Sequence, residues 1–138
     1  MMRRIVTYIM AAAIVAGLAG CRQFDVDEIL LEQEAVSLTI KGEPVFVYDE
    51  NKCQLACNWN RNEFRAMTDD MSDYFILRAH QQLSDLGQEF TADLIYTTAS
   101  NVREETGLTF TIEKIQNSSG LIWLWCSSKK IGVVVRML

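Results

Sequence analysis

The sequence is short of the residues that most catalytic sites require. It has one histidine, His80, and no nucleophile motif accompanies it. A histidine near the end of a predicted strand is more ordinarily a surface residue. The only proline is Pro44, and neither an internal repeat nor a low-complexity block is present, which argues against a repeat architecture. The sequence therefore predicts no enzyme.

Positive charge is also scarce. The chain has 13 lysines and arginines against 18 aspartates and glutamates. Arg3 and Arg4 lie in a predicted export signal, so the mature chain keeps 11 basic residues (13 − 2) and a net charge of −7 (11 − 18). Such a surface repels phosphate, which excludes nucleic acid as the main partner.

The first twenty residues are typical of an export signal. Arg3 and Arg4 precede an apolar stretch over residues 5–18, which is shorter than the roughly 20 residues of a permanent membrane span. The stretch ends in Leu18-Ala19-Gly20-Cys21, which resembles the lipobox of bacterial lipoproteins. The resemblance implies cleavage before Cys21 and acylation of that cysteine, including palmitate. The alternatives are an ordinary signal with an incidental cysteine and an uncleaved anchor.

The residues after Cys21 form an acidic tether over residues 21–34. Arg22 stands where some Gram-negative lipoproteins carry the aspartate that favours inner-membrane retention. The expected location is therefore the bacterial cell envelope, lipid-anchored, at the outer membrane. The tether's acids resemble the surface-export signals of Bacteroides-type lipoproteins, and a solvated linker explains them equally well: Asp25, Asp27, Glu28, Glu32 and Glu34.

From residue 35 to residue 138, short β-rich runs alternate with turns. About nine runs are expected to be strands: 36–41, 45–48, 53–59, 63–68, 72–79, 90–97, 108–115, 121–126 and 131–138. Their near-regular spacing predicts one all-β domain, either an antiparallel β-sandwich or a small up-and-down barrel. A helix is expected only at residues 26–35 or 79–86.

The last two strands can be paired from the sequence. If residues 127–130 close a hairpin, Trp125 lies opposite Gly132 and Cys126 opposite Ile131. One face is then apolar and is expected in the core: Ile122, Leu124, Cys126, Ile131, Val133 and Val135. The other face mixes indoles with a glycine and an arginine: Leu121, Trp123, Trp125, Gly132, Val134 and Arg136.

The preceding hairpin has two alternative registers. A loop of three or five residues places Phe110 and Ile112 beside Leu124 and Cys126. A loop of four residues moves both onto the tryptophan face, because one step of register exchanges the faces of a strand.

Trp123, Trp125 and Arg136 are the candidate ligand-binding residues. Indoles stack on sugars and apolar ligands, and a nearby arginine could orient a polar group. The other interpretation, which we expect to hold, is that another sheet or the segment 25–35 covers this face and buries both indoles.

The remaining cysteines and acids are weak candidates for a metal site. Cys53 and Cys57 would lie roughly 13 Å apart on one strand, which is too far for a disulfide. A disulfide from Cys126 to either one stays open, whereas zinc is disfavoured by the spacing. Asp69, Asp70 and Asp73 could supply oxygen ligands to calcium, but acidic turns are usually solvated. Neither a metal nor another cofactor is therefore predicted.

Three segments resemble a group of small uncharacterised lipoproteins of Bacteroides-type bacteria: 71–77, 123–126 and 132–136. This resemblance implies no activity. The sequence favours a lipid-anchored envelope domain that acts as a binding or structural accessory. Its partners would be the membrane, through lipid on Cys21, and a carbohydrate or a protein. The alternative is a small envelope hydrolase or an enzyme accessory subunit that uses His80 and the acids of residues 69–73.

Overall fold

The computed structural model describes residues 28–58, 60–99 and 101–136. Within them the chain is nearly all β, with nine antiparallel strands and one short helix. The all-β prediction is confirmed. The elements are α1 (Glu28–Glu32), β1 (Ser37–Ile40), β2 (Glu43–Val47), β3 (Cys53–Asn58), β4 (Glu63–Thr68), β5 (Tyr74–Ala79), β6 (Glu89–Thr98), β7 (Asn101–Gln116), β8 (Leu121–Cys126) and β9 (Ile131–Arg136).

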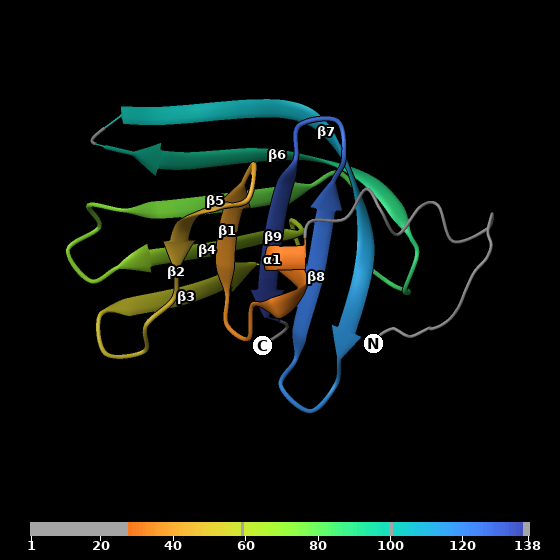
Figure 1. The fold of residues 1–138 in the computed structure, drawn as a ribbon, viewed down its shortest axis with the longest axis horizontal. Coiled ribbons are helices and arrows are strands. Elements are labelled where there is room, and N and C mark those ends of the chain that lie inside the picture. Colours follow the sequence, from red (N-terminus) through yellow and green to blue (C-terminus); the bar gives the residue numbers. More distant parts are fainter. Residues whose placement is uncertain (1–27, 59, 100, 137–138) are drawn as a thin grey trace.

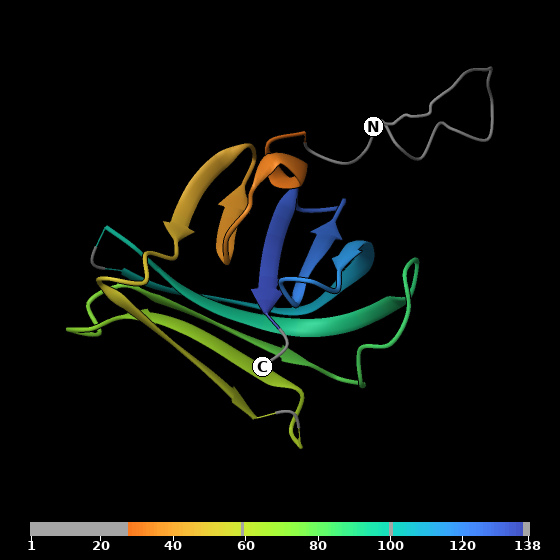
Figure 2. The same ribbon diagram turned by 90° about the horizontal axis from the view of Figure 1, so that it is seen from below.

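All nine strands belong to one sheet in the order β2-β1-β9-β8-β7-β6-β5-β4-β3. Strands β3 to β9 follow one another as a meander, and β1 then pairs with β9. The sheet curls into a half-barrel in which β3 to β6 cross β1, β8 and β9 (Figures 1 and 2). The two halves face each other like the layers of a sandwich, but they are continuous through the 16-residue strand β7. Strands β2 and β3 remain the two edges.

The core lies between the two halves of the curled sheet. Side chains alternate in and out along each strand, so every second residue of β4, β5 and β6 is buried. Phe46 of β2 contacts Phe75 of β5 with ring centroids 5.5 Å apart, and Phe64 lies 6.0 Å from Phe75. The contact of Phe46 with Phe75 joins the two halves, because β2 and β5 lie far apart in strand order, whereas Phe64 and Phe75 lie on the neighbouring strands β4 and β5.

The final hairpin has the predicted register. Trp125 pairs with Gly132 and Cys126 with Ile131. The loop before β8 has four residues, since Gln116 pairs with Leu121. A register shift between Ile112 and Lys114 then returns Ile112 to a position opposite Leu124. The irregularity in β7 therefore allows a four-residue loop together with the apolar pairing that the sequence predicted for a loop of three or five residues.

Helix α1 falls inside the range 26–35 where a helix was expected. The alternative range 79–86 is wrong, because after Ala79 the chain runs through bends and turns to Glu89. Figure 2 shows α1 on the outer face of the half that contains β8 and β9, and Leu30 is completely buried there. Among the described residues, no helix is long and apolar enough to span a membrane.

Candidate functional site

The tryptophan face of β8 is covered. Trp123 is 1% exposed and Trp125 is 4% exposed. The indole N–H of Trp123 donates to the Gln33 carbonyl at 3.0 Å, and the Lys114 ammonium lies 4.4 Å from the Trp123 ring. The segment around α1 closes this face, so the expected burial of both indoles is confirmed and the open groove considered for them is wrong.

The third candidate of that set, Arg136, is half-buried at the end of β9. Its guanidinium carbon lies 5.8 Å from the centre of the Tyr48 ring, a cation–π contact with the segment that follows β2. Arg136 pairs with Leu121, whereas Trp125 pairs with Gly132 at the other end of the hairpin. The structure therefore does not bring Arg136 and both indoles together around an accessible space.

Cys53, Cys57 and Cys126, the cysteines within the described residues, do not form disulfides. Cys53 and Cys126 are buried thiols, and the Cys57 sulfur lies 3.6 Å from the Arg136 carbonyl oxygen, to which it donates. Among residues 28–58, 60–99 and 101–136, no three histidine, cysteine or acidic side chains converge on a point where a metal could bind. Cys21 lies outside the described residues.

The acids between β4 and β5 form separate hydrogen bonds. The Asp70 carboxylate accepts from the Ser72 backbone N–H at 3.0 Å, the Ser72 hydroxyl at 2.8 Å and the Thr68 hydroxyl at 2.8 Å. These donors lower the pKa of Asp70 to about 2, with the Ser72 backbone N–H contributing most. Asp69 accepts from the Gln54 amide, and Asp73 accepts from the Thr97 hydroxyl. The arrangement stabilises a turn.

His80 lies at the opposite end of β5. Its Nδ1 is 2.8 Å from the Thr91 hydroxyl and its Nε2 is 3.1 Å from the Asp93 carboxylate. Asp93 also accepts the Gly107 N–H, and this bond, followed by the one from His80, lowers the pKa of Asp93. Strand β5 separates His80 from Asp73 by roughly 20 Å. The structure therefore does not unite His80 with the acids of residues 69–73.

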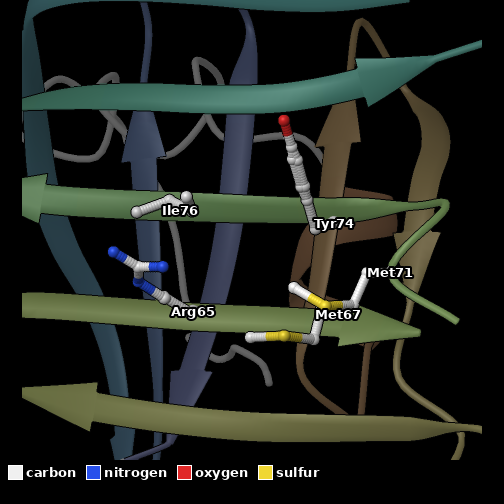
Figure 3. Close-up of a pocket in the computed structure, with 5 residues that line it drawn as sticks. All are labelled: Arg65, Met67, Met71, Tyr74 and Ile76. Atoms are coloured by element: carbon white, nitrogen blue, oxygen red, sulfur yellow. The ribbon is translucent and has the colours of Figure 1, made fainter. Parts of the chain in front are cut away.

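The outer face of β4 and β5 carries a hollow that the sequence did not reveal. Five side chains line a space of about 350 Å³, here called the methionine hollow (Figure 3): Arg65, Met67, Met71, Tyr74 and Ile76. Cross-strand pairing builds it, because Arg65 lies opposite Ile76 and Met67 opposite Tyr74. Met71 belongs to the turn, where its positive φ of 62° is a conformation that residues other than glycine rarely adopt.

The residues at the outward positions of β4 and β5 are a sequence signal for this hollow. Buried residues alternate with them along β4 and β5, so polar side chains would be expected facing out. Met67, Tyr74 and Ile76 occupy these positions instead, half-exposed, and Met71 is 69% exposed. The apolar character of the outward face, rather than any motif, could have identified it.

The charged end of the hollow is held by Glu63. Its carboxylate accepts from Arg78 at 2.6 Å and from Arg65 at 3.1 Å, and these bonds, chiefly that from Arg78, lower the pKa of Glu63. The guanidinium of Arg65 is thereby oriented beside apolar side chains. The hollow can accept an apolar group that carries a polar or anionic end toward Arg65.

No protein-family model, curated protein or solved structure matches the chain. Its function is therefore inferred from its amino-terminal sequence and from the two outer faces of the sheet.

Proposed function

We propose that the mature protein is a lipid-anchored domain of the bacterial cell envelope, at the outer membrane, and that it acts as a binding or structural accessory rather than as an enzyme. The support for the anchor is the sequence Leu18-Ala19-Gly20-Cys21 directly after the apolar residues 5–18. Two or three acyl chains on one cysteine would hold a domain stably on a membrane, whereas a single chain gives marginal binding.

The methionine hollow is the observation that supports a binding role. Its lining combines two thioethers, a phenol and an aliphatic side chain with one guanidinium. Methionine side chains are flexible and polarisable, and they are common on surfaces that adapt to a partner. The indoles that would stack on a sugar are buried, so the hollow favours an apolar side chain of a protein partner over a carbohydrate.

The anchor is tested by labelling and fractionation. Cells expressing the full chain are fed a palmitate analogue, and the protein is followed in membrane and soluble fractions. We expect label and membrane association in the wild type, and loss of both in Cys21→Ser. Mass spectrometry that finds an unmodified mature amino terminus would refute the anchor.

The hollow is tested with anilinonaphthalene sulfonate, an apolar fluorophore whose sulfonate matches Arg65. We expect its fluorescence with the folded domain to fall in Tyr74→Ala and in Met67→Ala. Val47→Ala is the matched control, because Val47 is an exposed apolar residue on the opposite edge strand β2. Equal fluorescence in all three variants would show that the dye does not bind in the hollow.

The alternative function, a small envelope hydrolase or an enzyme accessory subunit, draws on the position of His80 between Thr91 and Asp93. A hydroxyl, an imidazole and a carboxylate linked in this order by hydrogen bonds are the groups that a nucleophilic hydrolase uses. Hydrolysis of p-nitrophenyl acetate that disappears in both His80→Ala and Thr91→Val would favour this alternative. Activity equal in the wild type and both variants would argue against it.

A further inference from the structure

Helix α1 is fixed to the sheet by a notch in β9. Gly132 lies between Thr39 of β1 and Trp125 of β8 in one cross-strand row. The absent side chain leaves room for Leu30, since a Cβ at position 132 would lie 2.7 Å from the Leu30 Cδ1. Leu30 is 0% exposed in this position.

A second contact lies beside the first. The Trp123 indole donates to the Gln33 carbonyl at 3.0 Å, so β8 binds the chain just after α1. A helix of five residues does not form alone in water, because nucleation costs more than so short a helix returns. The place and the existence of α1 therefore depend on these contacts with the sheet.

We propose that α1 is an orienting clamp: it holds the outer face of β1, β9 and β8 toward the lipid surface and directs the methionine hollow away from it. This inference rests on the proposed lipidation of Cys21. It adds that the anchored domain has a fixed orientation, with its binding face turned toward the aqueous phase.

The length of the chain supports the clamp. Nine residue steps separate Cys21 from Leu30 and sixteen separate it from Ser37, the first residue of the sheet. At no more than about 3.6 Å per step, these segments reach about 32 Å and about 58 Å, whatever path they take. A domain of roughly 110 residues is about 34 Å across, so half its circumference is about 50 Å.

These lengths mean that the clamp decides how far around the domain the lipid anchor can reach. With Leu30 held in the notch, the anchor cannot reach around to the far side of the domain. With Leu30 released, the full segment to Ser37 could do so, and either face could meet the lipid. Figure 2 shows α1 and the strands β3 to β5 on opposite sides of the molecule. The acidic surface gives no attraction to anionic lipid that would set an orientation instead.

The experiment compares two labelled positions on vesicles. Lipidated protein is reconstituted in phosphatidylcholine vesicles that contain a headgroup spin-labelled quencher. A thiol-reactive fluorophore is placed by Leu31→Cys on α1 or by Ala56→Cys on the outer face of β3, both exposed. The background is Cys57→Ser, because Cys53 and Cys126 are buried. We expect the label at position 31 to lose most of its fluorescence and the label at position 56 to lose little.

Clamp variants then separate this proposal from the anchor. Leu30→Ser and Gly132→Val should remove the difference between the two positions while the protein stays on the vesicles. Leu83→Ala, a buried substitution in the turn after β5, is the control for general destabilisation and should retain the difference. Equal quenching in the wild type, or a difference that survives both clamp variants, would overturn the clamp. Failure of the wild type to bind vesicles would instead overturn the proposed lipid anchor.

Discussion

Replacement of Gly132 by alanine should destabilise the protein, although the same change in a strand ordinarily stabilises it. No positive φ is found at Gly132, and at such a position alanine normally stabilises by about 0.4–1 kcal/mol, because it reduces the freedom of the unfolded chain. Here the new Cβ would lie 2.7, 2.9 and 3.0 Å from three carbons of Leu30. Carbon atoms in contact lie about 3.5–4.0 Å apart, so Leu30 must retreat by about 1 Å.

The size of the expected loss of stability follows from the tight packing around Leu30. It is completely buried, so it can retreat only if α1 lifts from β9. Overpacking of this kind costs about 1–3 kcal/mol. Leu30→Ala removes the clash and leaves a cavity, for which we expect a loss of about 2–3 kcal/mol, at the low end for buried leucine because the site is at a helix on the surface.

A double-mutant cycle tests this explanation. Urea unfolding of the mature chain carrying Cys21→Ser is followed by tryptophan fluorescence for both single variants and the double variant. In the Leu30→Ala background, Gly132→Ala should cost nothing or stabilise, which gives a coupling of about 1–3 kcal/mol. Leu31→Ala, one residue along and partly exposed, is the control and should change the free energy of unfolding little. A Gly132→Ala protein as stable as the wild type, or additive losses in the double variant, would refute the clash.

Three further predictions concern polar contacts. The pKa of Asp70 is about 2 in the folded chain against an ordinary 3.8, so its stabilising effect is complete above the ordinary value and is lost as pH falls through about 2. Asp70→Asn should therefore unfold at lower urea than the wild type at pH 7, and an undiminished difference at pH 2 would contradict this. Glu63→Gln should lower the free energy of unfolding by about 0–1 kcal/mol, because Arg65 and Arg78, with which Glu63 pairs, are exposed. The loss should be smaller in about 1 M salt, and a loss that does not depend on salt would exclude an ionic origin. Trp123→Phe should cost about 0.5–1.5 kcal/mol through loss of the bond to the Gln33 carbonyl, and an unchanged urea midpoint would show that water replaces this bond.

The nine strands and the final hairpin could be predicted because their signals are local. Alternation of apolar and polar residues or a short continuous apolar run marks each strand, and turn residues bound them. The pairing of Trp125 with Gly132 follows from a short loop and two apolar faces, and the structure has that register. The pairing of β1 with β9 has no comparable signal, because Leu38 and its partner Val133 lie 95 positions apart in the sequence.

The candidate site could not be predicted because it depends on contacts between distant elements. The tryptophan face is covered because Gln33 accepts from Trp123 and Leu30 packs on Gly132 beside Trp125, and both residues belong to a segment whose composition is that of an acidic tether. The methionine hollow requires the register of β4 against β5 and the left-handed backbone of Met71. A one-residue change in that register would place Met67 and Tyr74 on opposite faces of the sheet and remove the hollow.

The two halves of the curled sheet differ in how far their outer faces are covered by other parts of the chain. All six residues of β8 are buried, and a strand that is apolar on both faces needs a cover on each. The core covers one face, and the segment that leads into β1 covers the other, because β1 lies beside β9 and brings that segment across it. On β4 and β5 the outward residues Met67, Tyr74 and Ile76 are also largely apolar, yet they are only half-buried, and Met71 beside them is 69% exposed. The remaining exposure of this apolar face is the reason that the proposed binding role is assigned to the methionine hollow and not to the covered face of β8.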